Sequence, residues 1–188
     1  VETLFKQSSD TVLQYADNAY KTAGLSANQY METVTSFSAS LLQSLGGDTA
    51  KAAKQADKAI TDMADNANKM GTDIQSIQYA YQGFAKQNYT LLDNLALGYG
   101  GTQAEMQRLI KDAAKLSDTV DAQSMSFDNI VEAIHVVQTE MGITGTTALE
   151  AGRTISGSIG AMKSAWGNLL TGLADGNADI EQLVDNLV

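Results

Sequence analysis

The apolar residues of this chain recur at alternating spacings of three and four along almost its whole length. That is the period of an α-helix that buries one face, and no segment keeps the period of two that marks a half-buried strand. The pattern therefore predicts an all-α protein of about seven amphipathic helices, arranged as helical hairpins or a bundle, either compact or elongated. The apolar stripes run over residues 5–19, 30–41, 53–70, 74–84, 106–116, 127–141 and 155–173.

Several predicted helices begin at a capping-box spacing, in which a Ser or Thr is followed three residues later by Glu or Gln. Glycines at 24, 46–47, 98, 100–101, 142 and 145 separate the stripes and are typical of helix ends. Short loops between helices follow from this spacing. The pairs are Ser26 with Gln29, Thr102 with Glu105, and Thr147 with Glu150, the last opening a short helix.

The most regular stripe begins with Ala53, Ala56, Ile60 and Met63 and continues in register across Gly71. Alanine buries only one methyl group, so this face needs close contact with a neighbouring helix. Two interpretations of Gly71 stand open. Either the chain breaks there and Thr72 with Gln75 starts a second helix of a hairpin, which we favour, or one helix continues through the glycine at a cost of roughly 1 kcal/mol.

A second packing face is predicted near the C-terminus, where Ile155, Ile159 and Trp166 lie on one stripe interleaved with glycines. We expect Trp166 to be a core residue or an interface anchor. Lys163 and Asn168 interrupt the stripe, so about twenty residues of bilayer-compatible sequence are not present. A helix of a soluble bundle is favoured over a membrane span, and insertion into a membrane interface stays open.

Composition divides the chain into two parts. Residues 1–97 form an N-terminal part of three to four helices, heptad-like over 49–95, and residues 102–188 form a glycine-punctuated C-terminal part. The boundary is the glycine-rich run 98–101. Because the chain begins at Val1 and residues 179–187 resemble the start of a further helix, we expect a fragment of a longer chain.

The 188 residues include neither proline nor cysteine. The lack of proline suits long helices, and the lack of cysteine excludes disulfides, thiolate metal sites and a cysteine nucleophile. The formal net charge is −10, and the 12 basic residues are scattered. Direct binding to nucleic acid is therefore not expected, since phosphate binding needs clustered Lys and Arg.

Two segments imitate ligand-binding loops but lack the required context. The glycine run 98–101 precedes a helix, yet no Lys-Ser or Lys-Thr pair follows and no strand precedes, so a simple loop is favoured over a phosphate site. Asp175, Asn177 and Asp179 mimic the start of a calcium loop. The sixth position is Ile180 and the twelfth Asn186, where glycine and glutamate are needed, so a capping turn is favoured.

The single histidine, His135, cannot complete a zinc site without another His or a Cys. We expect a solvated or capping side chain there, although general-base work with Glu132 or Glu140 is conceivable. A cell-wall hydrolase would have to use Glu132, Glu140 or Glu150, which are more simply solvated helix charges. We therefore expect no catalytic residue, no metal and no cofactor.

From about Leu25 to Asn177 the chain resembles the recurrent helical region of tape measure proteins from long-tailed phages and prophages of Gram-positive bacteria. The match is long and ordered and covers roughly four-fifths of the sequence. Its segments are GLSANQYMETVTSFSASLLQSLGGDT at 24–49, DMADNANKMGTDIQSIQYAYQGFAKQNYTLLDNLALGYGGT at 62–102, IHVVQTEMGITGTTALEAGRTISGSIGAMKSAWGNLL at 134–170, and the trailing TGLADGNAD.

The resemblance implies a non-catalytic ruler and scaffold, around which tail tube subunits polymerise and which leaves the virion ahead of the genome. The expected partners are further copies of the chain and tail tube or tail assembly proteins. The expected location is the lumen of the virion tail, and the host cytoplasm during assembly. The glycine-punctuated second half looks more like a folded assembly domain than a rod. An alternative is a membrane-interacting module used during genome ejection, motivated by residues 155–173.

Overall fold

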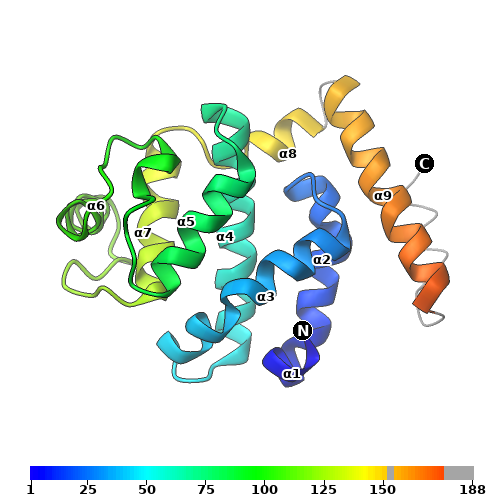
Figure 1. Ribbon diagram of the computed structural model, residues 1–188, viewed down its shortest axis with the longest axis horizontal. Helices are drawn as coiled ribbons and strands as arrows, with labels where there is room; N and C mark the ends of the chain where they lie inside the picture. The colour runs from blue at the N-terminus through cyan, green and yellow to red at the C-terminus, as the bar shows by residue number, and fades with distance from the viewer. Residues whose placement is uncertain (152–154, 176–188) are drawn as a thin grey trace.

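The computed structural model describes residues 1–151 and 155–175, with side chains described for 1–151 and 160–172. Those residues form helices and no strand, which confirms the all-α prediction. Figure 1 shows their arrangement. In chain order the elements are α1 (Glu2–Phe5), η1 (Lys6–Ser8), α2 (Ser9–Thr22), α3 (Ala27–Ser44), α4 (Thr49–Met70), α5 (Ile74–Ala85), η2 (Leu92–Leu95), α6 (Gln103–Leu116), α7 (Phe127–Glu140), α8 (Thr146–Ala151) and α9 (Ile155–Asp175).

Two of the four predicted N-caps, Ser26 and Thr102, form where expected, whereas Thr72 and Thr147 do not cap helices. Ser26 and Gln29 form the expected capping box at the start of α3. At α6 only half of the expected pair forms: the Thr102 hydroxyl accepts from the Glu105 amide, but the Glu105 carboxylate accepts from Gly100 N instead of reaching back to Thr102. The carboxylate thus occupies the position in which a phosphate would bind the glycine run.

The chain breaks at Gly71, as we favoured, and α4 and α5 are separate helices. Gly71 lies in the left-handed region with φ 68°, a conformation that costs little only for glycine. The predicted cap at Thr72 is wrong. Asp73 caps α5 by accepting from Ser76 N, while the Thr72 hydroxyl donates to the side chain of Asn66.

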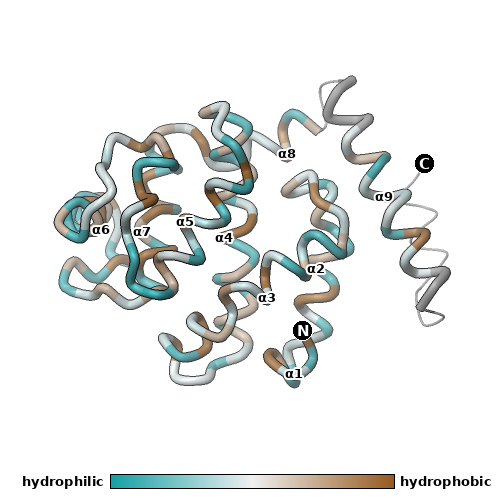
Figure 2. Tube along the Cα trace, in the orientation of Figure 1, coloured by the Kyte–Doolittle hydropathy of each residue, from teal (hydrophilic) through white to brown (hydrophobic). Residues whose placement is uncertain are grey.

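Helix α4 lies at the centre of the molecule and contacts α2, α3, α5, α7 and α8 (Figure 1). Its alanine-rich face is buried as the sequence predicts, since Ala53, Ala56, Ile60 and Met63 are each at most 1% exposed. Figure 2 shows how hydrophobic and hydrophilic positions alternate along the helices around it. These four side chains pack against other helices of the same chain, so this fold does not offer them to a second copy.

One hydrophobic core joins the two parts that the sequence separates at 98–101. It extends from Phe5 to Ile143 and includes residues on both sides of the glycine run. Contacts of α7 with α3 and α4 carry it across the expected boundary. Within this run, the backbone of Gly101 lies against the backbone of Thr90. A Cβ at position 101 would lie 2.2 Å from the carbonyl oxygen of Thr90.

Helix α9 lies at the edge of the molecule, on the far side from α6 (Figure 1). It packs against α2, α3 and α8 through small and polar residues, of which Ser164, Ala165 and Asn168 are buried. The Asn168 side chain accepts from Ala27 N at 2.7 Å and so satisfies an amide in the first turn of α3. Among the described residues, no helix is long and apolar enough to cross a membrane.

Candidate functional site

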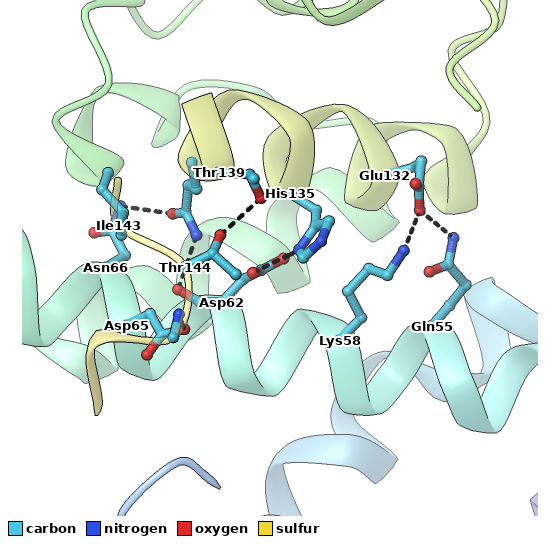
Figure 3. A network of polar contacts seen from close by, with 12 residues as sticks. Gln55, Lys58, Asp62, Asp65, Asn66, Glu132, His135, Thr139, Ile143 and Thr144 are labelled. Carbon is cyan, nitrogen blue, oxygen red and sulfur yellow. Dashed lines mark hydrogen bonds and ion pairs between the residues drawn. The ribbon is translucent and has the colours of Figure 1, made fainter. Parts of the chain in front are cut away.

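Two features of the described residues carry potential function. The first is a buried polar interface between α4 and α7, which contains the single histidine (Figure 3). The second is an exposed apolar face on α9. The sequence pointed to His135 and Trp166 separately, but it gave no sign of the side chains that surround the histidine.

The polar interface begins with three buried polar side chains on α4, namely Asp62, Asp65 and Asn66, none more than 1% exposed. Their spacing of three and one places them on one side of the helix, toward α7 and the segment that follows it. A polar group removed from water costs free energy unless it is hydrogen-bonded. Each of the three finds at least one partner that lies far away in the sequence.

Asp62 pairs with His135. Nδ1 of the imidazole lies 2.9 Å from Oδ1 and 3.0 Å from Oδ2 of the carboxylate. Burial raises the pKa of Asp62 to about 6, and the hydrogen bond from His135 opposes that rise. The same hydrogen bond raises the pKa of His135, because the carboxylate favours the protonated ring.

Our expectation of a solvated or capping histidine is therefore wrong. His135 is half-buried and joined to a carboxylate on another helix. Asp62, Asp65 and Asn66 lie off the apolar stripe of α4, where polar residues ordinarily face water, so the sequence pattern held no signal that they are buried.

Asn66 continues the network. Its side-chain NH₂ donates to the carbonyl of Leu95 at 2.9 Å and to Oε1 of Gln138 at 2.8 Å. Gln138, which is also fully buried, donates back to the backbone carbonyl of Asp62 at 3.1 Å. This reciprocal pair fixes the register of α7 on α4, because a slip by one residue would leave two buried amides without partners.

Asp65 holds the start of α8. Its two carboxylate oxygens accept from the backbone amides of Gly145 at 2.6 Å and Thr147 at 2.8 Å. A carboxylate at a helix start satisfies free amides and is favoured by the helix dipole. The short helix predicted from Thr147 and Glu150 thus forms as α8, but its cap comes from α4 instead of from Thr147.

Near the start of α7, Glu132 forms an ion pair with Lys58 at 2.5 Å and accepts from Gln55 and Thr119 (Figure 3). Burial alone would raise the pKa of Glu132, but these donors lower it overall. A hollow of about 430 Å³ adjoins this pair and is lined by Lys58 and Glu132, but not by Asp62 or His135.

The other carboxylates considered for hydrolysis do not join this cluster. Glu140 and Glu150 are exposed. Glu140 lies two helical turns beyond Glu132, about 12 Å along α7. Within 1–151 and 160–172, no group of His, Cys, Asp or Glu could hold a metal ion. The candidate calcium loop at 175–179 lies outside the residues whose side chains are described.

An Asp–His pair can act as a general base when a substrate or nucleophile lies next to the second ring nitrogen. Here the nearest hydroxyl along α7, that of Thr139, bonds to Thr144 at 3.0 Å (Figure 3). The Asp62–His135 contact joins α4 to α7.

Comparison with known proteins returned no match: no family model fits the sequence, and no curated protein or solved structure is significantly similar to it.

The second feature is the apolar face of α9. Met162, Trp166 and Leu170 are 54%, 52% and 53% exposed and follow one another at intervals of four residues. The expectation that Trp166 belongs to the core is wrong, and the interface alternative stays a prediction. Ile155 and Ile159 lie in α9, but their side chains are outside the described set.

The described side chains of α9 are therefore arranged in the opposite sense to those of a usual amphipathic helix. Ser164, Ala165 and Asn168 are buried, whereas Met162, Trp166 and Leu170 are exposed. Two hydrogen bonds join the helix to the start of α3: Asn168 accepts from Ala27 N, and Thr171 accepts from the side chain of Asn28. A contiguous apolar stripe on a soluble surface marks an interaction site.

Proposed function

We propose that this chain is a non-catalytic scaffolding segment of a phage tail tape measure protein, which contacts other protein chains during tail assembly and length determination. The observation that carries the proposal is the exposed stripe Met162, Trp166 and Leu170 on α9. The long resemblance of the sequence to tape measure proteins supplies the biological setting.

The stripe supports a role in protein contacts because its three side chains are not buried within the fold. Polar contacts of Asn168 and Thr171 hold α9 in place, so the three large side chains are available to another molecule. Tryptophan is among the residues that contribute most to protein interfaces. The partners in this proposal are further copies of the chain and tail tube or tail assembly proteins, in the tail lumen and earlier in the host cytoplasm.

The remaining features fit a scaffold without chemistry of its own. In this proposal the Asp62–His135 pair fastens α4 to α7 and turns over no substrate. The net charge of −10 keeps the surface from adhering to DNA that shares the same channel. Direct nucleic-acid binding is therefore not part of the proposed role.

The test introduces a charged residue into the exposed stripe of α9 and examines the tails of a phage that carries this variant. Trp166→Asp should abolish or shorten tails, because a carboxylate cannot be desolvated in an apolar interface. Leu116→Asp is the matched control, since Leu116 is 51% exposed at the end of α6, where we had expected a buried residue. Electron microscopy of tails measures the result. Tails of normal number and length in Trp166→Asp would contradict the proposal.

A membrane-interacting module remains the second candidate, and the same stripe favours it. An exposed row of Met, Trp and Leu on one helix face can enter the interface of a bilayer. Flotation of the purified chain with neutral and with anionic vesicles tests this candidate. Recovery of the protein in the vesicle fraction, lost in Trp166→Asp, would support it, and an absence of binding to both would exclude it.

A further inference from the structure

A polar hollow lies between α3 and α5, which pack against each other. Its volume of about 370 Å³ falls in the lower part of the range of small-ligand sites, roughly 300 to 1,000 Å³. As far as the chain is described, the lining includes neither Asp62 nor His135, and none of it comes from α9. The hollow is therefore separate from the two features described above.

Both helices contribute a row of four residues to the hollow, at the spacing i, i+3, i+4 and i+7 that marks one side of a helix. Where two helices of a bundle face each other, this spacing ordinarily carries apolar residues. Here it carries amides, hydroxyls and one carboxylate. The row on α3 is Gln29, Glu32, Thr33 and Ser36, and the row on α5 is Gln75, Gln78, Tyr79 and Gln82.

Several polar groups of these rows have no partner within the protein. One hydrogen bond joins the rows, from Nε2 of Gln78 to the hydroxyl of Thr33 at 3.2 Å. In the part of the chain that the structure describes, the side chains of Gln75, Gln82 and Glu32 bond to no other residue. Each amide side chain has both donors and an acceptor. The hollow thus offers hydrogen bonds of both kinds to a ligand.

The charge and the polarity of the lining exclude several classes of ligand. Among the described residues that line the hollow, Glu32 is the single charged one. An anion would therefore meet a carboxylate and no cation, and one carboxylate is too few for a hard metal ion. Leu25 and Ile74 are the aliphatic residues of the described lining, which are too few for a lipid or an apolar helix. A neutral ligand rich in donors and acceptors remains.

Tyr79 favours a sugar among the neutral polar ligands. It lines the hollow and is 58% exposed. A sugar ring has a face of C–H groups that can stack on an aromatic ring, while its hydroxyls both donate and accept hydrogen bonds. An extended peptide binds mainly along a free strand edge, and the described residues include no strand.

From these observations we propose that the hollow between α3 and α5 binds a neutral carbohydrate. The ring of Tyr79 stacks on one face of a sugar, and the amides of Gln75 and Gln82 bond to its hydroxyls. This site goes beyond the proposed scaffolding role and does not rest on it. Because water competes for each hydrogen bond, we expect a dissociation constant of roughly 1 mM for a tetrasaccharide.

NMR titration of the isotope-labelled chain with maltotetraose, cellotetraose and chitotetraose tests the site. At least one of these neutral sugars should shift the amide signals of residues 29–36 and 74–82 in a saturable way, while the signals of α6 stay in place. The absence of a saturable shift with all of them, up to about 20 mM, would overturn the proposal. Stronger shifts of the same signals with tetra-alanine would also overturn it and would assign the hollow to a peptide.

Two pairs of variants test the named contacts. Tyr79→Ala should weaken binding by about fivefold or more, whereas Tyr79→Phe, which keeps the ring, should bind as the wild type does. Gln82→Leu should weaken binding several-fold, and Gln107→Leu on α6 is the matched control that should leave it unchanged. Wild-type affinity in either Tyr79→Ala or Gln82→Leu would overturn the proposed arrangement. Unchanged amide signals away from the hollow show that each variant is folded.

The result is independent of the tail-assembly test. A chain that binds none of the sugars but whose Trp166→Asp variant stops tail assembly would reject the carbohydrate site and leave the scaffolding role standing. A chain that binds a sugar at this hollow, while Trp166→Asp gives normal tails, would keep the site and contradict the scaffolding role.

Discussion

At the scale of single residues, the structure is organised by polar side chains that meet across the core. Asp62 and His135 are 73 positions apart in the sequence, and Asp65 lies 80 positions from the amide of Gly145. Each contact removes the cost of a buried polar group by supplying a specific partner. Such contacts select one packing of α7 and α8 on α4, since other packings leave these groups unpaired.

The Asp62–His135 pair should make stability depend on pH. Both pKa values are raised in the folded state, that of Asp62 to about 6, so the folded chain binds protons more tightly than the unfolded chain. The stabilisation is present below the unfolded pKa values and is lost as pH rises through the folded ones. The contribution of this pair to the unfolding free energy should therefore fall from about pH 4 to above pH 6.5.

Replacing both groups by neutral amides, Asp62→Asn with His135→Gln, should flatten this dependence while an amide pair can still bond across the helices. Urea unfolding at a series of pH values measures it. Glu140→Gln on the exposed side of α7 is the control and should keep the wild-type slope. A double variant whose pH profile matches that of the wild type would show that the pair does not titrate with folding.

Removal of the Asp65 side chain should lower the unfolding free energy more than removal of an ordinary helix cap. Asp65→Ala leaves the amides of Gly145 and Thr147 without acceptors in a partly buried place, which should cost about 2 kcal/mol. Asp73→Ala removes an exposed cap of α5 and should cost about 1 kcal/mol. Denaturant unfolding of the two variants compares them. An equal loss in both would mean that water replaces the Asp65 carboxylate.

At the scale of elements, the apolar period runs in unbroken register across the break between α4 and α5. The sequence therefore left a continuous helix possible, and the backbone at Gly71 decides against it. The turn allows α5 to return beside α3 as well as α4. A continuous helix would carry the second half of the stripe away from this core.

Replacing glycine by alanine should change the stability of the protein in opposite directions at Gly71, which ends a helix, and at Gly160, which lies inside one. Gly71→Ala should destabilise the protein by about 1 kcal/mol, because a Cβ is disfavoured in the left-handed conformation. Gly160→Ala, inside α9 where a Cβ would meet no atom within 4 Å, should stabilise it by up to about 1 kcal/mol. Thermal unfolding of both variants is the measurement. Stabilisation by Gly71→Ala would indicate that the helix continues through this position.

At the scale of the whole molecule, one core centred on α4 is joined by a peripheral helix with a different kind of contact. Helices α3, α4, α5 and α7 bury large apolar side chains together, whereas the side chains that α9 buries between residues 160 and 172 are small or polar. Opening this part of α9 exposes little apolar surface, and opening α4 exposes much of the core. Local stability should therefore differ across the molecule.

Amide hydrogen exchange should reveal this difference. Amides in the middle of α4 and α7 should exchange only through global unfolding, and those of α9 should exchange faster by a separate local opening. Uniform protection of α4 and α9 at low concentration would contradict this account.

The sequence by itself determined which segments are helical, where most of them begin, and that Ala53, Ala56, Ile60 and Met63 form a packing face. These properties are local, because a period of three to four and a cap depend only on near neighbours along the chain. His135 and Glu132 stood out by type, but their partners did not, since nothing local marks a residue more than 70 positions away.

Only the tertiary structure decided which face of each helix turns inward and which polar residues are buried. Helix α9 has an apolar face that periodicity assigns to a core, yet Asn168 and its neighbours turn the other face toward the protein. Asp62, Asp65 and Asn66 are polar residues that periodicity assigns to solvent, yet they are buried. In both cases the outcome depends on a complementary surface that another part of the chain provides, and local sequence carries no record of it.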